Sequence, residues 1–139
     1  MSTKDPFTGI WKLNLERSHF GSRHRPTSGT MTWERTSEGY LMRAEGLTGD
    51  GKVVQERPQA LALDEKEHPI VGAPYLREIA HQPDPNTIHI QAKNADEVVG
   101  VGSYIVSADR RTLIAVASGA DAQQKPFLTV AVWDRQKFT

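Results

Sequence analysis

Turn-forming sequences recur about every ten residues along this chain, and no other feature constrains its fold as strongly. Glycine supplies a positive φ, proline fixes φ, and aspartate or asparagine bonds to its own backbone, so each cluster ends an extended segment. This spacing is typical of an all-β sandwich or barrel. The turn clusters are Ser37–Gly39, Thr48–Gly51, Gln82–Asn86, Asn94–Asp96, Ser107–Asp109 and Gly119–Asp121.

Between the turns the sequence predicts short strands rather than helices. Apolar and polar residues alternate, as where Met31 and Trp33 share one face of a segment, and no long window has helical periodicity. The links are too short for parallel crossovers, which take about a dozen residues or more. The predicted strands are 7–14, 28–36, 40–47, 52–63, 75–82, 87–93, 97–107, 112–119 and 127–135.

We therefore expect an all-β fold, a closed antiparallel up-and-down β-barrel of roughly eight to ten strands. The first and last strands are both apolar, which favours their pairing, and closure removes exposed sheet edges. The chain has 139 residues, enough for one domain over 1–139 to bury a core without disulfides.

Composition narrows the class of partner. Lysine plus arginine equals aspartate plus glutamate at 17 each. A neutral chain lacks the basic face that nucleic acids or anionic membranes require, so we expect neither as a partner. There is no cysteine, which excludes disulfides and thiolate metal sites. The start lacks the basic head and apolar run of a secretory signal, and we expect a cytoplasmic protein.

The opening strand carries a specific pattern. Phe7–Leu13 reads Phe-Thr-Gly-Ile-Trp-Lys-Leu, and an arginine, Arg135, follows Trp133 in the last strand. This pattern resembles the Gly-x-Trp signature of the calycin superfamily, which includes lipocalins, fatty-acid-binding proteins and avidins. The resemblance implies that Trp11 lies across the closed end of a barrel with Arg135 packed over its indole, a contact worth about 0.5–2 kcal/mol.

Several further stretches resemble a group of small lipocalin-like bacterial proteins of largely uncharacterised function. These stretches cover turns as well as the opening strand, so they indicate the fold but give little information about a ligand or a reaction. The second-loop and disulfide features of a full lipocalin are absent. The matching stretches are Asp5–Asn14, Pro85–Ile88, Asp109–Leu113 and Lys125–Phe127.

The resemblance and the apolar side chains favour the binding of a small apolar or amphipathic ligand inside the barrel. A barrel of about eight strands can also be filled by its own side chains. Small residues on the later strands, among them Gly102, Ala115 and Ala131, favour a cavity instead. The expected ligand-binding residues are Trp33, Tyr40, Met42, Tyr75, Arg77, His81, Tyr104 and Trp133.

The strand at 75–82 can face either way. If Tyr75, Arg77 and His81 face inward, they supply a phenol, a cation and an imidazole, and Arg77 or His81 would anchor a polar head. That arrangement supports an alternative function, an enzyme (cyclase, isomerase or hydrolase) with His81 and Arg77 as its catalytic residues. In the opposite orientation, Glu78 and Ala80 face inward.

Two further features of the sequence concern metal binding and self-association. Among the five histidines, His81 and His89 lie on neighbouring predicted strands, but no third ligand has metal-binding spacing, so we expect no metal and no cofactor. The segments Val98–Val106 and Leu113–Ala117 are apolar on both faces, which indicates a possible homodimer interface.

Overall fold

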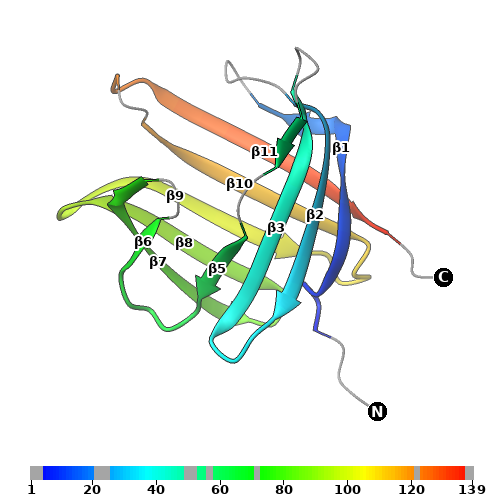
Figure 1. Cartoon of the computed structure of the whole chain (residues 1–139), viewed down its shortest axis with the longest axis horizontal. Helices are drawn as coiled ribbons and strands as arrows, with labels where there is room; N and C mark the ends of the chain where they lie inside the picture. The colour runs from blue at the N-terminus through cyan, green and yellow to red at the C-terminus, as the bar shows by residue number, and fades with distance from the viewer. Residues whose placement is uncertain are drawn as a thin grey trace.

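The computed structural model describes residues 5–20, 26–48, 53–55, 58–70, 73–120 and 123–136 (Figure 1). Within these ranges the regular secondary structure is all β-strand, and no helix is long and apolar enough to cross a membrane. The strands are β1 (Gly9–His19), β2 (Pro26–Arg35), β3 (Gly39–Thr48), β4 (Val53–Gln55), β5 (Gln59–Ala62), β6 (His68–Ile70), β7 (Ala73–Asp84), β8 (Thr87–Asn94), β9 (Glu97–Val106), β10 (Thr112–Ala120) and β11 (Pro126–Arg135).

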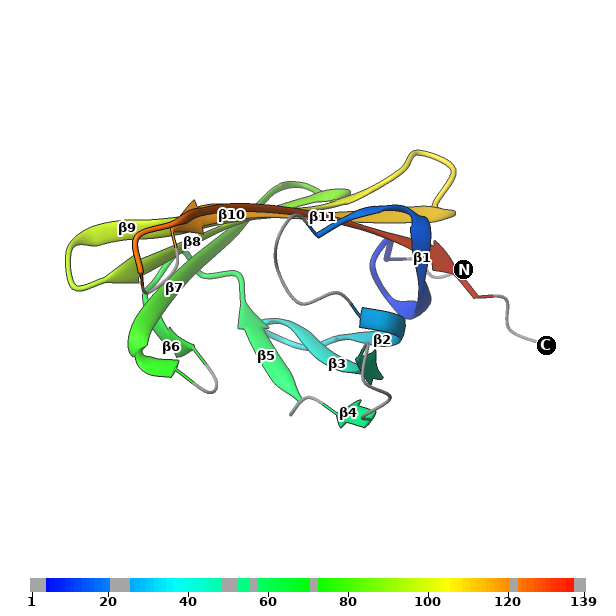
Figure 2. The ribbon, with the colours of Figure 1, turned by 90° about the horizontal axis from the view of Figure 1, so that it is seen from above.

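The strands form one antiparallel sheet in the order β4-β3-β2-β1-β11-β10-β9-β8-β7-β6, with β5 paired to β3. Each long strand lies beside its neighbour in sequence, and β1 pairs with β11 through Trp11 and Arg135. The predicted all-β, up-and-down arrangement is confirmed. Figure 2 shows β8–β11 as one layer facing β2–β5, with β1 curving between them.

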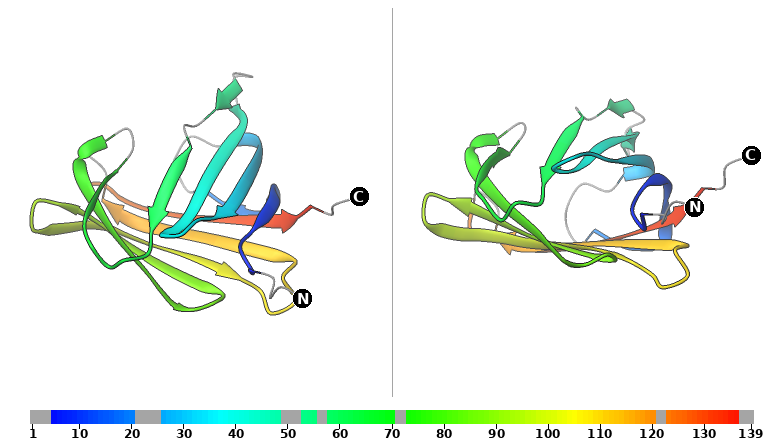
Figure 3. Two further views of the ribbon diagram at one scale, coloured as in Figure 1. Left: turned by 60° about the horizontal axis from the view of Figure 1, so that its bottom comes forward. Right: turned by 90° about the horizontal axis from the view of Figure 1, so that it is seen from below.

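The barrel is nearly closed rather than fully ringed by backbone hydrogen bonds. No strand ladder joins β5 to β6 or β7 among the described residues, and Figure 3 shows β5 beside β3 with the β6–β7 hairpin across from it. Side chains bridge this side of the barrel at its closed end. Gln82 Nε2 donates to Tyr40 Oη at 3.4 Å, and Arg35 Nη1 donates to Gln82 Oε1 at 3.5 Å.

The closed end of the barrel has the predicted indole–guanidinium contact. Trp11 is fully buried, and the Arg135 Cζ lies 4.2 Å from the centroid of its ring. The guanidinium also donates hydrogen bonds to three backbone carbonyls, those of Pro6, Thr8 and Arg110. Gly9 has φ 140°, and a Cβ there would lie 2.5 Å from Arg135 Nη1, which explains why the signature needs glycine.

An aromatic layer fills the barrel next to this contact. Trp33 is fully buried and lies 5.0 Å from Phe7, 5.3 Å from Tyr40 and 5.0 Å from Tyr104, measured between ring centroids. Tyr40 Oη donates to Asp5 Oδ1 at 2.5 Å. Burial and this carboxylate raise the pKa of Tyr40. The core therefore gathers at the closed end of the barrel.

Candidate ligand-binding cavity

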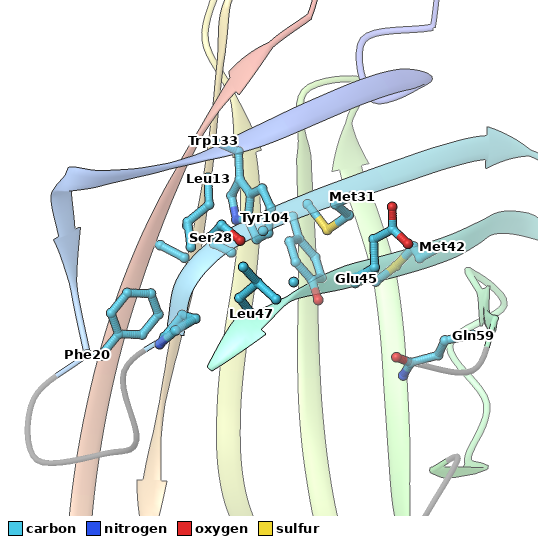
Figure 4. A pocket seen from close by; sticks show the side chains of 16 residues that line it. Leu13, Phe20, Ser28, Met31, Met42, Glu45, Leu47, Gln59, Tyr104 and Trp133 are labelled. Atoms are coloured by element: carbon cyan, nitrogen blue, oxygen red, sulfur yellow. The ribbon is translucent and has the colours of Figure 1, made fainter. Parts of the chain in front are cut away.

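Beyond the aromatic layer the barrel contains a cavity of about 340 Å³ that opens to solvent (Figure 4). This volume lies within the range of small-molecule sites. Strands β1–β3 form one wall and β9–β11 the other. The large apolar side chains in the lining are Leu13, Phe20, Met31, Met42, Leu47, Tyr104 and Trp133.

Small residues on β9–β11 leave this space open. Tyr104, Ala115 and Ala131 form one row across these strands, and all three line the cavity. In the next row Gly102 lies opposite Ala117, again with little side-chain volume. The sequence expectation that small residues on the later strands favour a cavity agrees with this arrangement.

The two walls differ in chemistry. Met31 and Met42 are 5% and 9% exposed and lie on β2 and β3, whereas Tyr104 and Trp133 present aromatic rings from β9 and β11 (Figure 4). Methionine is flexible and polarisable, so it can adapt to irregular apolar shapes and contact rings favourably. The cavity therefore has one adaptable wall and one more rigid wall.

Few polar groups reach the cavity. Ser28, Glu45 and Gln59 contribute to its lining, and no lysine, arginine or histidine does so among the described residues. The indole nitrogens of Trp33 and Trp133 are buried and have no hydrogen-bond partner in that same part of the chain. A buried donor left unpaired costs about 1–3 kcal/mol. The site is thus predominantly apolar.

A second hollow, of about 650 Å³, lies at the far ends of β7, β9 and β10. Its lining includes Tyr75, Val98 and Val101, whose side chains are 71%, 47% and 49% exposed. It is larger than the first hollow, but these exposures place it on the outer surface. The barrel cavity has the more apolar lining of the two and is the better site for an apolar ligand.

The structure divides the predicted ligand-binding residues into three groups. Met42, Tyr104 and Trp133 line the cavity. Trp33 and Tyr40 are fully buried in the aromatic layer, where they support the cavity without lining it. The remaining three, Tyr75, Arg77 and His81, lie on the outward face of β7.

Of the two orientations that the sequence left open for the strand at 75–82, the structure has the one with Tyr75, Arg77 and His81 facing outward. Ala80 is 1% exposed in the core, and because side chains alternate along a strand, its neighbour His81 and the exposed Arg77 point outward. His81 faces His89 across the outer surface, with ring centroids 5.3 Å apart. The predicted catalytic pair, His81 and Arg77, thus does not reach the cavity.

Several lining residues were absent from the predicted set. Leu13 follows Trp11 at a spacing of two, so alternation along the first strand would have placed it inside the barrel. Leu47 and Glu45 carry no such signal. At Gly46 a Cβ would lie 2.3 Å from the carbonyl oxygen of Ser28, so β3 approaches β2 closely just where these residues reach the cavity.

The inward face of β7 carries a carboxylate, Glu78. Burial raises its pKa, and the charge of the nearby His68 opposes that rise. A carboxyl whose pKa is higher in the folded than in the unfolded protein favours folding at a pH below its unfolded-state pKa. This contribution to stability is lost as the pH rises through the folded-state pKa.

We therefore expect Glu78→Gln to raise the midpoint of thermal unfolding above that of the wild-type protein at pH 7. At pH 3, where Glu78 is protonated in both states, the two midpoints should differ little. Thermal unfolding followed by circular dichroism at both pH values tests this. A glutamine variant that is less stable at pH 7 would contradict it.

No family model and no curated protein matches this sequence. Solved structures do match it. The zebrafish ileal bile acid-binding protein complexed with cholic acid superposes with a TM-score of 0.61 at 11% identity, over 94% of this chain and 99% of that one. As-p18, described as an extracellular fatty acid binding protein, gives a TM-score of 0.52 at 17% identity, over 95% and 97%.

This chain has the same barrel fold. The likeness confirms the antiparallel β-barrel architecture that the Gly-x-Trp opening implied. It extends over nearly the whole of each chain. The resemblance to small bacterial lipocalin-like proteins stays a prediction.

Proposed function

We propose that this protein binds a small, partly apolar ligand in the barrel cavity. The observation that carries the proposal is the hollow of about 340 Å³ above a filled, closed floor, with a lining that is largely apolar. Two proteins of the same fold are named for the binding of bile acids and fatty acids. Burial of apolar ligand surface contributes about 25 cal/mol per Å².

In this proposal Met42, Tyr104 and Trp133 contact the ligand together with Leu13 and Met31. The methionines adapt to its shape, and the two aromatic rings form the opposite wall. Trp33 and Tyr40 belong to the aromatic layer that fills the closed end of the barrel next to the cavity. The homodimer and the cytoplasmic location inferred from the sequence stay predictions.

The chain contains a built-in reporter of binding. Of its three tryptophans, Trp11 and Trp33 are fully buried, and Trp133 lines the cavity. We expect titration with dodecanol, a neutral amphiphile, to change the tryptophan fluorescence of the wild-type protein. Trp133→Phe should abolish most of the change while calorimetry still detects binding, because phenylalanine keeps an aromatic wall.

The matched control is Trp33→Phe, which removes a tryptophan that does not line the cavity. Its fluorescence response to dodecanol should persist. Absence of calorimetric binding by the wild-type protein would contradict the proposed function. An unchanged fluorescence response in Trp133→Phe would show that the ligand binds outside this cavity.

A further inference from the structure

Glu78, a carboxylate on the inward face of β7, has surroundings that suggest a role in ligand recognition. Glu78 lies on the same face of β7 as the buried Ala80 and is partly buried itself. It pairs with Ala92 on β8, which in turn pairs with Gly100 on β9. Its row neighbours on β8 and β9 are therefore small, and they do not cover the inner side of the carboxylate.

No cation among the described residues forms an ion pair with this carboxylate. Lys93 Nζ, from the neighbouring strand β8, is 3.2 Å from Glu67 Oε2, so its charge is already paired. Arg77 is exposed on the outward face of β7. Among the described residues Glu78 has no hydrogen-bond or ion-pair partner, and only the charge of His68 acts on it.

His68 is the group that faces Glu78 from the adjoining strand. The two residues are register partners on β6 and β7. The His68 Nε2 is 3.0 Å and 2.9 Å from the two carboxylate oxygens of Asp64, so its nearest acidic partner is Asp64 rather than Glu78. The interior carboxylate thus retains its capacity to accept hydrogen bonds from a ligand.

The sheet register relates Glu78 to the cavity. Tyr104, in the cavity wall, pairs with Ile88 on β8, and Ala92 lies four residues further along that strand. Four residues span roughly 13 Å, about the length of twelve extended main-chain bonds. A ligand with an extended chain in the apolar cavity can therefore place its head group near Glu78.

We propose that the barrel prefers amphipathic ligands with a cationic head, such as an alkylammonium ion, and that Glu78 binds this head. This inference rests on the proposed function and specifies its ligand class. A carboxylate head would meet a like charge at Glu78 and no cation in the described cavity lining. An ammonium head would form a charge-assisted hydrogen bond there.

The test compares three amphiphiles with the same chain: dodecylammonium, dodecanol and dodecanoate. Binding is measured through tryptophan fluorescence and calorimetry at pH 8, because alkaline pH favours the ionised form of Glu78, and at low salt, because screening is then weak. We expect the wild-type protein to bind dodecylammonium at least tenfold more tightly than dodecanoate. Glu78→Gln should reduce this ratio to below threefold, and Glu78→Lys should reverse it.

The matched control is Glu34→Gln, which removes the same charge from an exposed position next to the buried Trp33 on β2. It should leave the ratio unchanged. Tight dodecanol binding with no preference between the two charged amphiphiles would overturn the cationic-head proposal and leave the proposed function intact. If none of the three binds, the proposed function itself fails. If Glu34→Gln lowers the ratio as much as Glu78→Gln, net charge and not Glu78 determines the preference.

Discussion

Replacing Trp11 with alanine is expected to lower the free energy of unfolding by about 3–5 kcal/mol. The indole is fully buried, the Arg135 guanidinium stacks 4.2 Å from its centroid, and its Nε1 donates to the carbonyl of Phe7 at 3.0 Å. The substitution removes a fully buried indole from the closed end of the barrel and leaves the Phe7 carbonyl without its donor. Urea unfolding followed by circular dichroism measures the loss.

Trp133→Ala is the matched control for this prediction. Its ring borders the open cavity and its Nε1 has no partner to lose among the described residues, so its removal should cost less than that of Trp11. A loss below about 1 kcal/mol for Trp11→Ala would show that the closed end is not a principal source of stability.

Filling the cavity is expected to weaken ligand binding strongly while leaving the fold stable. Ala115 lies between Tyr104 and Ala131 in the cavity wall, and a phenylalanine there projects into the empty space. We expect Ala115→Phe to weaken dodecanol binding by about 2 kcal/mol or more, roughly thirtyfold, because the ligand loses apolar contact area. Calorimetry measures this affinity, and urea unfolding measures the stability, which should change little.

The control is Val116→Phe, at the next position of β10, whose side chain alternates to the outer face. It adds the same side chain outside the barrel and should leave the affinity unchanged. If Ala115→Phe binds dodecanol as tightly as the wild-type protein, the ligand occupies another site. The second hollow, lined by Tyr75 and Val101, would then be the next region to test.

Most of the fold was predictable from local chemistry. The turn clusters at Ser37–Gly39, Gln82–Asn86, Asn94–Asp96 and Ser107–Asp109 lie where one long strand ends and the next begins, whereas Thr48–Gly51 and Gly119–Asp121 lie partly outside the described residues. The Trp11–Arg135 contact pairs the first strand with the last. The segment 52–63, predicted as one strand, contains β4 and β5 instead, and β6 was not predicted at all. Strands of three or four residues have too little alternation to recognise, and proline within β6 is tolerated because this strand lies at the sheet edge.

The candidate site was predictable only in part. Met42, Tyr104 and Trp133 line the cavity, whereas the polar residues Arg77 and His81 lie outside it. Trp33 is a large aromatic residue of the kind that contacts ligands, but it belongs to the buried aromatic layer. Large aromatic residues serve both roles, so composition does not distinguish a residue that touches a ligand from one that packs beneath it.

The amino-acid sequence by itself determined the all-β fold, the up-and-down order of the strands and the need for glycine at position 9 beside the Trp11–Arg135 contact. Turns and alternation could be recognised because they depend on residues that are close together in the chain. Only the tertiary structure decided which face of β7 points inward. Alternation is symmetric between the two faces of a strand. Packing of Ala80 into the core breaks that symmetry, and it places Glu78, not His81, inside the barrel.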